Sequence, residues 1–293
     1  MDKLKIAFII NPHSGTSAKK ELPEQINQLI NKDKFEVTTI FTEYAGHGKE
    51  LAAQYAAQGF NAVIACGGDG TVNEIASGLV GTKTAFGIVP FGSGNGLARH
   101  LHIPLNVRGA IKTINNYVLQ PLDCGVANDQ KFFCTCGTGF DAQIAWDFSQ
   151  QSTRGLRTYL KLILKEFVDY KPKHYIIETE SERLEVDAVV VTIANASQYG
   201  NDAYIAPQAK TNDGLLDICI IKPFRWYHIP RITAQLMSKH LNRSKLVTMT
   251  RAKSITLKRD FSGPFHYDGD PTEFGKEINI QIIPNALKAI GGK

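Results

Sequence analysis

The chain has 293 residues, of which 43% are hydrophobic and 21% charged. These proportions are typical of globular proteins and exclude a disordered chain, a collagen and a coiled coil. The longest apolar runs, such as 6–10 and 188–191, are far shorter than the roughly 18 residues of a membrane-spanning helix. The length predicts two domains, because one core rarely grows past about 250–300 residues.

The net charge of +5 is concentrated in one segment. Residues 222–259 contain ten Lys and Arg and no Asp or Glu, so the rest of the chain has 23 basic and 28 acidic side chains. A basic patch this local does not predict a nucleic-acid partner. The apolar run before Asn11 is too short for a secretory signal, so the five cysteines are expected to be reduced thiols in the cytoplasm.

The first 120 residues alternate between strand and helix patterns. Strands are predicted at 4–10, 36–41, 62–66 and 85–89, and helices around 22–30, 51–55 and 75–79. This alternation predicts an α/β domain with a mostly parallel sheet that helices cover on both faces. Ligands of such sheets bind at the carboxyl ends of the strands.

After Pro121 strand patterns dominate. They lie at 132–136, 175–179, 184–193, 215–221, 254–257 and 278–283, and one helix is marked by Leu156, Tyr159, Leu160, Ile163 and Phe167. We therefore expect an antiparallel β-sandwich domain. The expected boundaries are 1–122 for the α/β domain and 123–293 for the second, with the last residues returning to the first domain.

A glycine-rich turn, Gly67-Gly68-Asp69-Gly70-Thr71, follows the third predicted strand and opens a helix. Such a turn lets backbone N–H groups approach phosphate oxygens closely. Thr71 and Glu74 match the capping-box pattern. A carboxylate in a phosphate cradle would repel the phosphate, so Asp69 predicts either Mg²⁺ coordination or a role at the reacting hydroxyl. The structural alternative is an ordinary tight turn.

Two further polar, glycine-bearing loops follow strands of the same sheet, at 11–15 (NPHSG) and 90–96 (PFGSGNG). Loops at the carboxyl ends of parallel strands converge on one crevice. We therefore expect these two loops and the 67–71 turn to form a single site.

These motifs, together with GTGFDA at 137–142, NDGL at 212–215 and DGD at 268–270, resemble the diacylglycerol kinase catalytic family of lipid kinases. Its members include soluble bacterial diacylglycerol kinases and sphingosine kinases. The resemblance runs in order from residue 11 to residue 270. It implies that a nucleotide binds in a cleft between the α/β domain and the β-sandwich domain.

The resemblance also implies roles for individual residues. The implied nucleotide-binding residues are Asn11, Ser14, Gly15, Thr42, Gly67, Gly68, Asp69, Gly70, Thr71, Asn73, Ser93 and Asn95. The implied catalytic carboxylates are Asp69, Asp268 and Asp270, and a structural Mg²⁺ is implied at Asp213 with the main-chain oxygens of Lys210 and Leu215. Asp270 stands where the family usually has glutamate, so the base is assigned more safely to Asp268 or Asp69 than to Asp270. GSGN also resembles the sphingosine kinase form, so the acceptor lipid stays open.

The expected activity is transfer of the γ-phosphoryl group of ATP, with Mg²⁺, to a lipid hydroxyl, with diacylglycerol first and a sphingoid base second. One alternative is a kinase of a soluble polyol or nucleotide, similar to NAD kinases. Another is a non-catalytic nucleotide- or lipid-binding regulator. We expect a cytoplasmic enzyme peripheral to the membrane, and a homodimer is compatible with the sequence.

The basic segment 222–259 has two interpretations. Trp226, Ile229, Ile232, Leu236 and Met237 recur at roughly helical spacing. Such a helix could contact an anionic membrane, which a lipid substrate would require. Alternatively, it is an ordinary helix whose apolar face packs on the sandwich.

Overall fold

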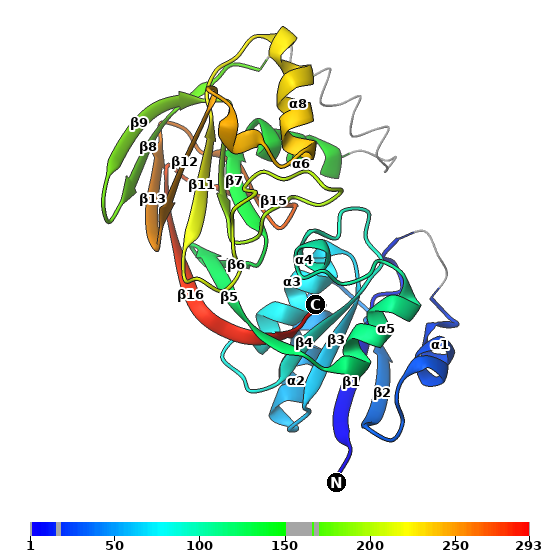
Figure 1. Ribbon diagram of the computed structural model, residues 1–293. Coiled ribbons are helices and arrows are strands. Elements are labelled where there is room, and N and C mark those ends of the chain that lie inside the picture. Colours follow the sequence, from blue (N-terminus) through cyan, green and yellow to red (C-terminus); the bar gives the residue numbers. More distant parts are fainter. Residues whose placement is uncertain (1, 16–18, 151–165, 167–169, 293) are drawn as a thin grey trace. The chain divides into compact units, whose positions relative to one another are not determined.

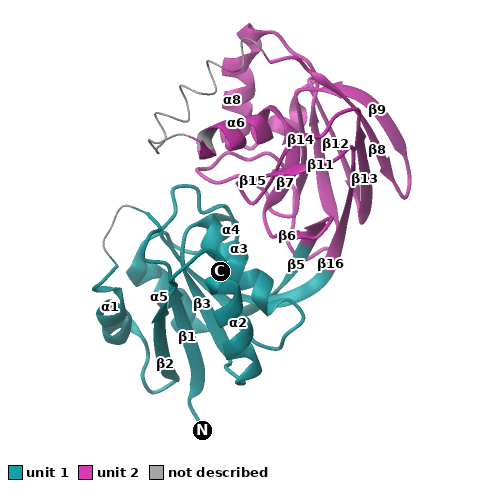
Figure 2. Ribbon diagram, turned by 180° about the vertical axis from the view of Figure 1, so that it is seen from behind, with its two compact units in different colours: residues 1–124, 284–293 teal, residues 125–283 magenta. Residues whose placement is uncertain are grey.

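The computed structural model describes residues 2–15, 19–150, 166 and 170–292. It divides the chain into two compact units, residues 1–124 with 284–293 and residues 125–283 (Figure 2). The chain thus leaves unit 1 after Cys124 and returns to it at Pro284. The predicted helix that carries Leu156 and Phe167 lies outside the described residues.

Unit 1 alternates strands and helices. Its elements are β1 (Leu4–Ile10), α1 (Leu22–Leu29), β2 (Phe35–Phe41), α2 (His47–Ala57), β3 (Ala62–Gly67), α3 (Asp69–Leu79), β4 (Ala85–Pro90), α4 (Gly96–His100), α5 (Val107–Asn116) and the first part of β5 (Leu119–Ala127). Strands β2, β1, β3 and β4 lie in that order and are parallel. The predicted parallel α/β sheet is therefore confirmed.

The strands of this sheet are apolar because helices cover both faces. Residues 6–10 of β1 and 62–66 of β3 are fully buried. Helix α1 packs beside α5, and α2 packs beside α3 (Figure 1). From β1 the chain first continues to β2 on one side of β1 and then crosses to β3 on the other side. The direction in which strands are added to the sheet therefore reverses between β1 and β3.

Unit 2 is built mainly from antiparallel strands. Its elements are β6 (Gln130–Phe132), β7 (Thr135–Gly139), α6 (Phe140–Ser149), β8 (Lys173–Thr179), β9 (Arg183–Ala188), β10 (Val190–Ala194), β11 (Leu216–Ile221), the 3-10 turns η1 (Trp226–His228) and η2 (Leu241–Arg243), α8 (Ile229–Met237), β12 (Val247–Ala252), β13 (Ser254–Arg259), β14 (Gly263–Tyr267), β15 (Asp270–Phe274) and β16 (Glu277–Ile290), which ends in unit 1.

The strands of unit 2 form two layers. One layer has the order β16-β13-β8-β9 and the other β12-β11-β10-β7-β14-β15. One buried apolar cluster takes side chains from both layers, among them Tyr175, Ile193, Leu257 and Phe265. The antiparallel sandwich expected from the strand patterns is confirmed.

Two of the predicted strands are each divided in the structure. The run 184–193 becomes β9, which pairs with β8, and β10, which pairs with β7 and β11 in the other layer. The chain changes layers at Val189, so one apolar run serves both. The run 132–136 breaks between β6 and β7 because the backbone amides of 133–135 bind a side chain instead of a strand.

Candidate functional site

The three loops predicted to converge lie together at the carboxyl ends of the parallel strands. The backbone N–H of Asn11 donates to the carbonyl of Cys66 (3.0 Å), and that of Phe91 donates to Gly67 (2.8 Å). The side chain of Asn11 donates to Thr71 Oγ1 (2.9 Å). The loops after β1, β3 and β4 therefore meet where the strand order reverses, which is the ligand-binding position of open α/β sheets.

Glycine is required where the second and third of these loops touch. A Cβ on Gly92 would lie 2.8 Å from Gly68 Cα, and a Cβ on Gly68 would lie 3.2 Å from Gly92 Cα. Two backbones this close leave no space for a side chain. Gly15 has a φ of +70° and packs directly on the carbonyl of Phe91, so the first loop joins the same contact.

The carboxylate of Asp69 binds the loop after β4. Its Oδ2 accepts from Asn95 N (3.0 Å) and its Oδ1 from Gly96 N (2.9 Å). Asn95 has a left-handed backbone and clasps Gly92, accepting from its N–H (2.8 Å) and donating to its carbonyl (2.7 Å). Asp69 therefore has backbone donors within unit 1 and fixes the geometry of the cradle.

The predicted capping box is wrong. Helix α3 begins at Asp69 after Gly68, which makes no side-chain cap. Thr71 Oγ1 instead accepts a hydrogen bond from the side chain of Asn11. The carboxylate of Glu74 accepts from Gly46 N (2.9 Å) and Gly48 N (3.2 Å). Glu74 thus caps α2 rather than its own helix, because α2 lies directly beside α3.

Lys19 is a member of the site that the sequence analysis did not identify. Its side chain is buried (4% exposed), and its ammonium donates to the main-chain oxygen and to Oγ (2.7 Å) of Ser14. It also lies 5.0 Å from the ring centre of Phe91. Burial lowers the pKa of Lys19. In the sequence, Lys19 is marked only by its position eight residues after Asn11, and no known motif spacing identifies such a lysine as part of a site.

The remaining residues expected at the nucleotide also lie in unit 1. Thr42 is buried directly after β2, and its N–H donates to Ile10 (2.9 Å). Asn73 is buried in α3 and accepts from Ser77 Oγ (3.3 Å). Ser93 is exposed in the loop after β4. The structure therefore gathers this set around one edge of the sheet.

Asp268 and Asp270 lie in unit 2, at the turn of the β14–β15 hairpin. Tyr267 pairs with Asp270, so Asp268 and Gly269 form a two-residue loop. Their φ angles are +48° and +88°, and positive φ at both positions is the requirement of a type I′ turn, which favours Asp-Gly. The DGD motif thus also has a structural explanation.

Asp268 is held firmly by backbone donors. Its carboxylate accepts from the N–H groups of Phe133 (2.9 Å), Cys134 (2.7 Å) and Thr135 (3.1 Å). Its own N–H donates to the carbonyl of Thr135 (2.7 Å). Asp270 is exposed at the start of β15. The two carboxylates therefore have different surroundings although they are two residues apart.

A buried arginine fixes the other end of the same hairpin. Arg259 is 4% exposed and donates to Thr138 Oγ1 (2.7 Å) and to the carbonyls of Gly263 (2.8 Å) and Phe274 (2.6 Å). Burial lowers the pKa of Arg259. These bonds join both hairpin strands to β7, so the turn with Asp268 projects from a rigid base.

The expected magnesium ligands lie around the 212–215 turn, but the carboxylate of Asp213 already has partners. Its Oδ1 accepts from Leu215 N (3.2 Å), and its Oδ2 accepts from Arg251 Nη2 (2.9 Å). Arg251 also binds both carboxylate oxygens of Asp217 (3.1 Å each), and these bonds raise the pKa of Arg251.

The guanidinium of Arg251 therefore supplies positive charge where the cation was expected. In the part of the chain that the structure describes, no three His, Cys, Asp or Glu side chains form a metal site. Main-chain oxygens are not among these groups, so the magnesium site expected at Lys210, Asp213 and Leu215 stays a prediction, with the Asp213 carboxylate also bound to Arg251.

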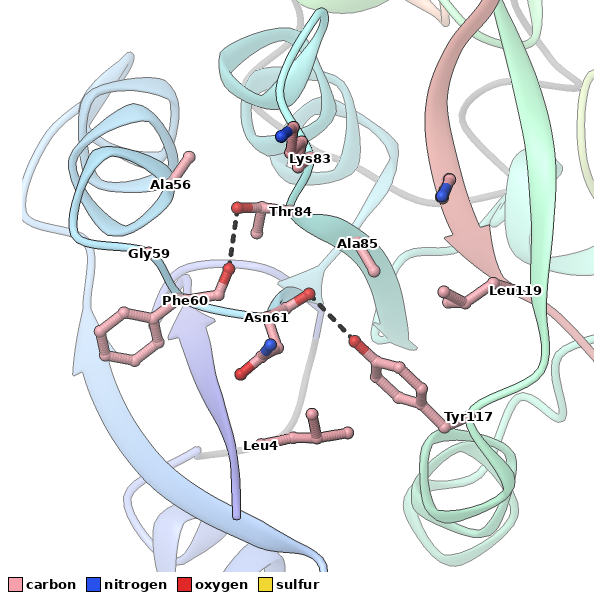
Figure 3. Close-up of a pocket in the computed structure, with 11 residues that line it drawn as sticks. Leu4, Ala56, Gly59, Phe60, Asn61, Lys83, Thr84, Ala85, Tyr117 and Leu119 are labelled. Carbon is pink, nitrogen blue, oxygen red and sulfur yellow. Dashed lines mark hydrogen bonds between the residues drawn. The ribbon is translucent and has the colours of Figure 1, made fainter. Parts of the chain in front are cut away.

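A surface hollow of about 530 Å³ lies at the opposite edge of the unit 1 sheet (Figure 3). It is lined by residues where strands begin, such as Leu4 and Ala85, and by Lys83 and Lys288. Tyr117 OH donates there to the carbonyl of Asn61 (3.0 Å). The hollow therefore does not coincide with the loops described above.

Comparisons with known proteins identify the family of the chain. Residues 5–127 match the diacylglycerol kinase catalytic domain, and residues 134–291 match the YegS C-terminal NAD kinase beta sandwich-like domain. The chain is 27% identical over 269 residues to a "Diacylglycerol kinase" of Bacillus subtilis (strain 168), covering 90% of this chain and 88% of that protein.

It is also 29% identical to a "Probable lipid kinase YegS-like" of Klebsiella pneumoniae (strain 342), covering 92% and 90% of the two chains. A crystal structure of a diacylglycerol kinase from Bacillus anthracis str. Sterne has the same fold, with a TM-score of 0.77, 22% identity and coverage of 98% and 97%. None of the described helices is both long and apolar enough to cross a bilayer. With both domain matches in order along one chain, the protein belongs to the diacylglycerol kinase/YegS family of lipid kinases.

Proposed function

We propose that this protein transfers the γ-phosphoryl group of ATP, taken as its Mg²⁺ complex, to the hydroxyl of diacylglycerol or, second, of a sphingoid base. The observation that carries the proposal is the meeting of three glycine-bearing loops at the reversal point of the unit 1 sheet. Close backbone approach and a helix amino terminus suit a polyphosphate.

Each part of the unit 1 site has a task in this reaction. The loops around Gly68 and Gly92 hold the phosphate chain, and Asp69 fixes their relative position through Asn95 and Gly96. The ammonium of Lys19 adds positive charge beside Ser14. The Mg²⁺ that accompanies ATP neutralises charge on the phosphoryl oxygens when bound.

The chemical step is a displacement at phosphorus. The lipid hydroxyl oxygen forms a bond to the γ-phosphorus, the bond to the bridging oxygen of ADP breaks, and a carboxylate takes the hydroxyl proton. Asp69, Asp268 and Asp270 are the candidates for this carboxylate. Asparagine variants separate them, because asparagine keeps an oxygen for backbone donors but cannot take the proton.

The test is incubation with labelled ATP, Mg²⁺ and a panel of micellar lipids. Label in an organic-extractable product supports the lipid kinase. Label in a water-soluble product instead supports a kinase of a polyol or nucleotide, and bound ATP without any transfer supports a non-catalytic regulator. Either of the last two outcomes refutes the proposal.

A matched pair of glycine variants tests the cradle. Gly92→Ala forces a Cβ against Gly68 and should weaken ATP binding at least about tenfold, whereas Gly275→Ala meets no atom within 4 Å and should not. Equal ATP affinity in both variants would show that the contact between the loops does not form the nucleotide site.

A further inference from the structure

Helix α8 of unit 2 (Figure 1) and the turn η1 before it expose an uncharged stripe of side chains. The α8 stripe consists of Trp226, Pro230, Thr233 and Met237, which are all exposed. Their spacing of four, three and four residues places them on one helix face. Trp226 is 75% exposed and Met237 is 49% exposed. Large apolar side chains so exposed on one face mark an interaction surface.

The stripe is not the face that holds α8 on the sandwich. Ile232 and Leu236 are partly buried and pack against the core cluster that includes Ile221 and Leu241. The interpretation of an ordinary helix that packs on the sandwich is therefore confirmed for this face, and membrane contact stays a prediction. An ordinary surface helix would present charged residues outward, whereas α8 has an apolar side inward and the uncharged stripe outward.

Exposed cations lie close to the stripe in the sequence. Lys222, Arg225, Arg231, Lys239, Arg243 and Lys245 are all exposed. No Asp or Glu occurs anywhere from 222 to 259. Other cations of the segment have partners elsewhere in unit 2, such as Arg251 with Asp217 and Lys258 with Glu178. Lys239 lies 4.4 Å from the ring centre of Tyr204, which donates to Asp202, whereas Arg225 and Arg231 are exposed cations next to the stripe in the sequence.

We propose that the α8 stripe is a membrane contact for anionic lipid surfaces. Trp226 and Met237 enter the boundary between headgroups and acyl chains, where tryptophan and apolar side chains of interfacial helices reside. Arg225 and Arg231 meet the anionic headgroups. Contact at this surface requires neither nucleotide nor turnover, so the inference goes beyond the proposed function.

Fluorescence can test the contact directly, because Trp146 and Trp226 are the two tryptophans. In a Trp146→Phe variant, Trp226 is the single reporter. Vesicles of phosphatidylglycerol and phosphatidylcholine should shift its emission to the blue and protect it from an aqueous quencher, and rising salt should reverse the effect. Emission that neither shifts nor becomes protected overturns the proposal.

Matched variants separate the two contributions. Trp226→Ser with Met237→Ser should weaken vesicle binding at least about tenfold, and Arg225→Gln with Arg231→Gln should weaken it about 30-fold at low salt. The control is Leu105→Ser, which removes an exposed apolar side chain (40%) from unit 1. Equal loss in the control would overturn the assignment to α8.

Two readouts distinguish other outcomes. Light scattering tests whether the stripe binds a second copy: a dimer that the Trp226→Ser change dissociates, with unchanged vesicle binding, overturns the proposal. Kinase activity should fall on vesicles but not on a short-chain, water-dispersed acceptor in the same variant. If no acceptor is phosphorylated at all, the proposed function fails while the vesicle-binding result still stands.

Discussion

Replacing Asp268 by alanine should destabilise unit 2 as well as affect turnover. The change removes the acceptor of three N–H groups, on Phe133, Cys134 and Thr135. These residues are 0%, 6% and 2% exposed, so their amides have little access to water. Each buried donor left without an acceptor costs about 1–3 kcal/mol.

The magnitude follows from these contacts and from the backbone. Because the turn itself is exposed and admits some water, we take about 1 kcal/mol for each of the three amides. Alanine at a φ of +48° adds about 1 kcal/mol of strain. The expected loss is therefore about 4 kcal/mol, a large part of the stability of a typical domain.

Asparagine and a neighbouring aspartate provide the controls. Asp268→Asn tolerates the left-handed backbone and keeps one acceptor oxygen, so it should lose only about 1–2 kcal/mol. Asp270→Ala removes an exposed carboxylate from the same hairpin and should change stability by less than about 0.5 kcal/mol.

Urea unfolding followed by tryptophan fluorescence measures these effects in the correct unit, because Trp146 and Trp226 both lie in unit 2. The midpoint and slope give the free energy of unfolding. If the free energies of unfolding of the alanine variant and the wild type differ by less than about 1 kcal/mol, the three amides do not depend on Asp268 and the reasoning fails.

Three further predictions concern charged groups in the two units. Arg251→Met should lower the stability of unit 2 by about 1–2 kcal/mol, since Asp213 and Asp217 lose their cation. Added Mg²⁺ should raise the melting temperature of this variant but not that of the wild type. Equal responses would contradict the idea that Arg251 supplies the positive charge expected from a metal ion at Asp213. Burial, with the charge of His102 second, lowers the pKa of His100 to about 4, so the unfolded chain binds the proton more readily and stability should fall by about 2.5 kcal/mol as the pH drops from about 6.5 to 4. Hydrogen exchange of β3 and β4 should show the fall, and His100→Gln should remove it. Lys19→Met should weaken ATP binding about tenfold or more, as measured by calorimetry, and wild-type affinity would exclude Lys19 from the site.

Much of unit 1 follows from local sequence. Apolar runs at 4–10 and 62–66 formed the strands expected of them, because a strand covered on both faces must be apolar throughout. The glycine-bearing loops at 67–71 and 90–96 were expected to converge, and the contact between Gly68 and Gly92 confirms that they meet. The run 184–193 divided because strand patterns do not record which layer a residue joins. The run 132–136 broke because its amides bind the distant Asp268 side chain.

The partners of polar side chains could not be predicted in this way. Glu74 looked like a cap of its own helix, yet it caps α2, 26 and 28 positions away. Arg251 and Lys19 carried no motif at all. A carboxylate or a guanidinium can bind any suitable group within a few ångströms, so its partner depends on which distant segments the fold brings beside it.

By itself, the sequence determined the order of the elements, the glycine turns and the family resemblance. Hydrophobic periodicity, backbone flexibility and turn chemistry each depend on only a few neighbouring residues. Only the tertiary structure decided what the carboxylates hold: Asp69 binds amides 26 and 27 positions later, and Asp268 binds amides 133 to 135 positions earlier. It also decided that Ile232 and Leu236 of α8 pack on the sandwich, whereas Met237 of α8 and Trp226 of η1 are exposed. Such contacts form only after the strands have paired and packed, since packing alone sets which distant groups come within hydrogen-bonding distance.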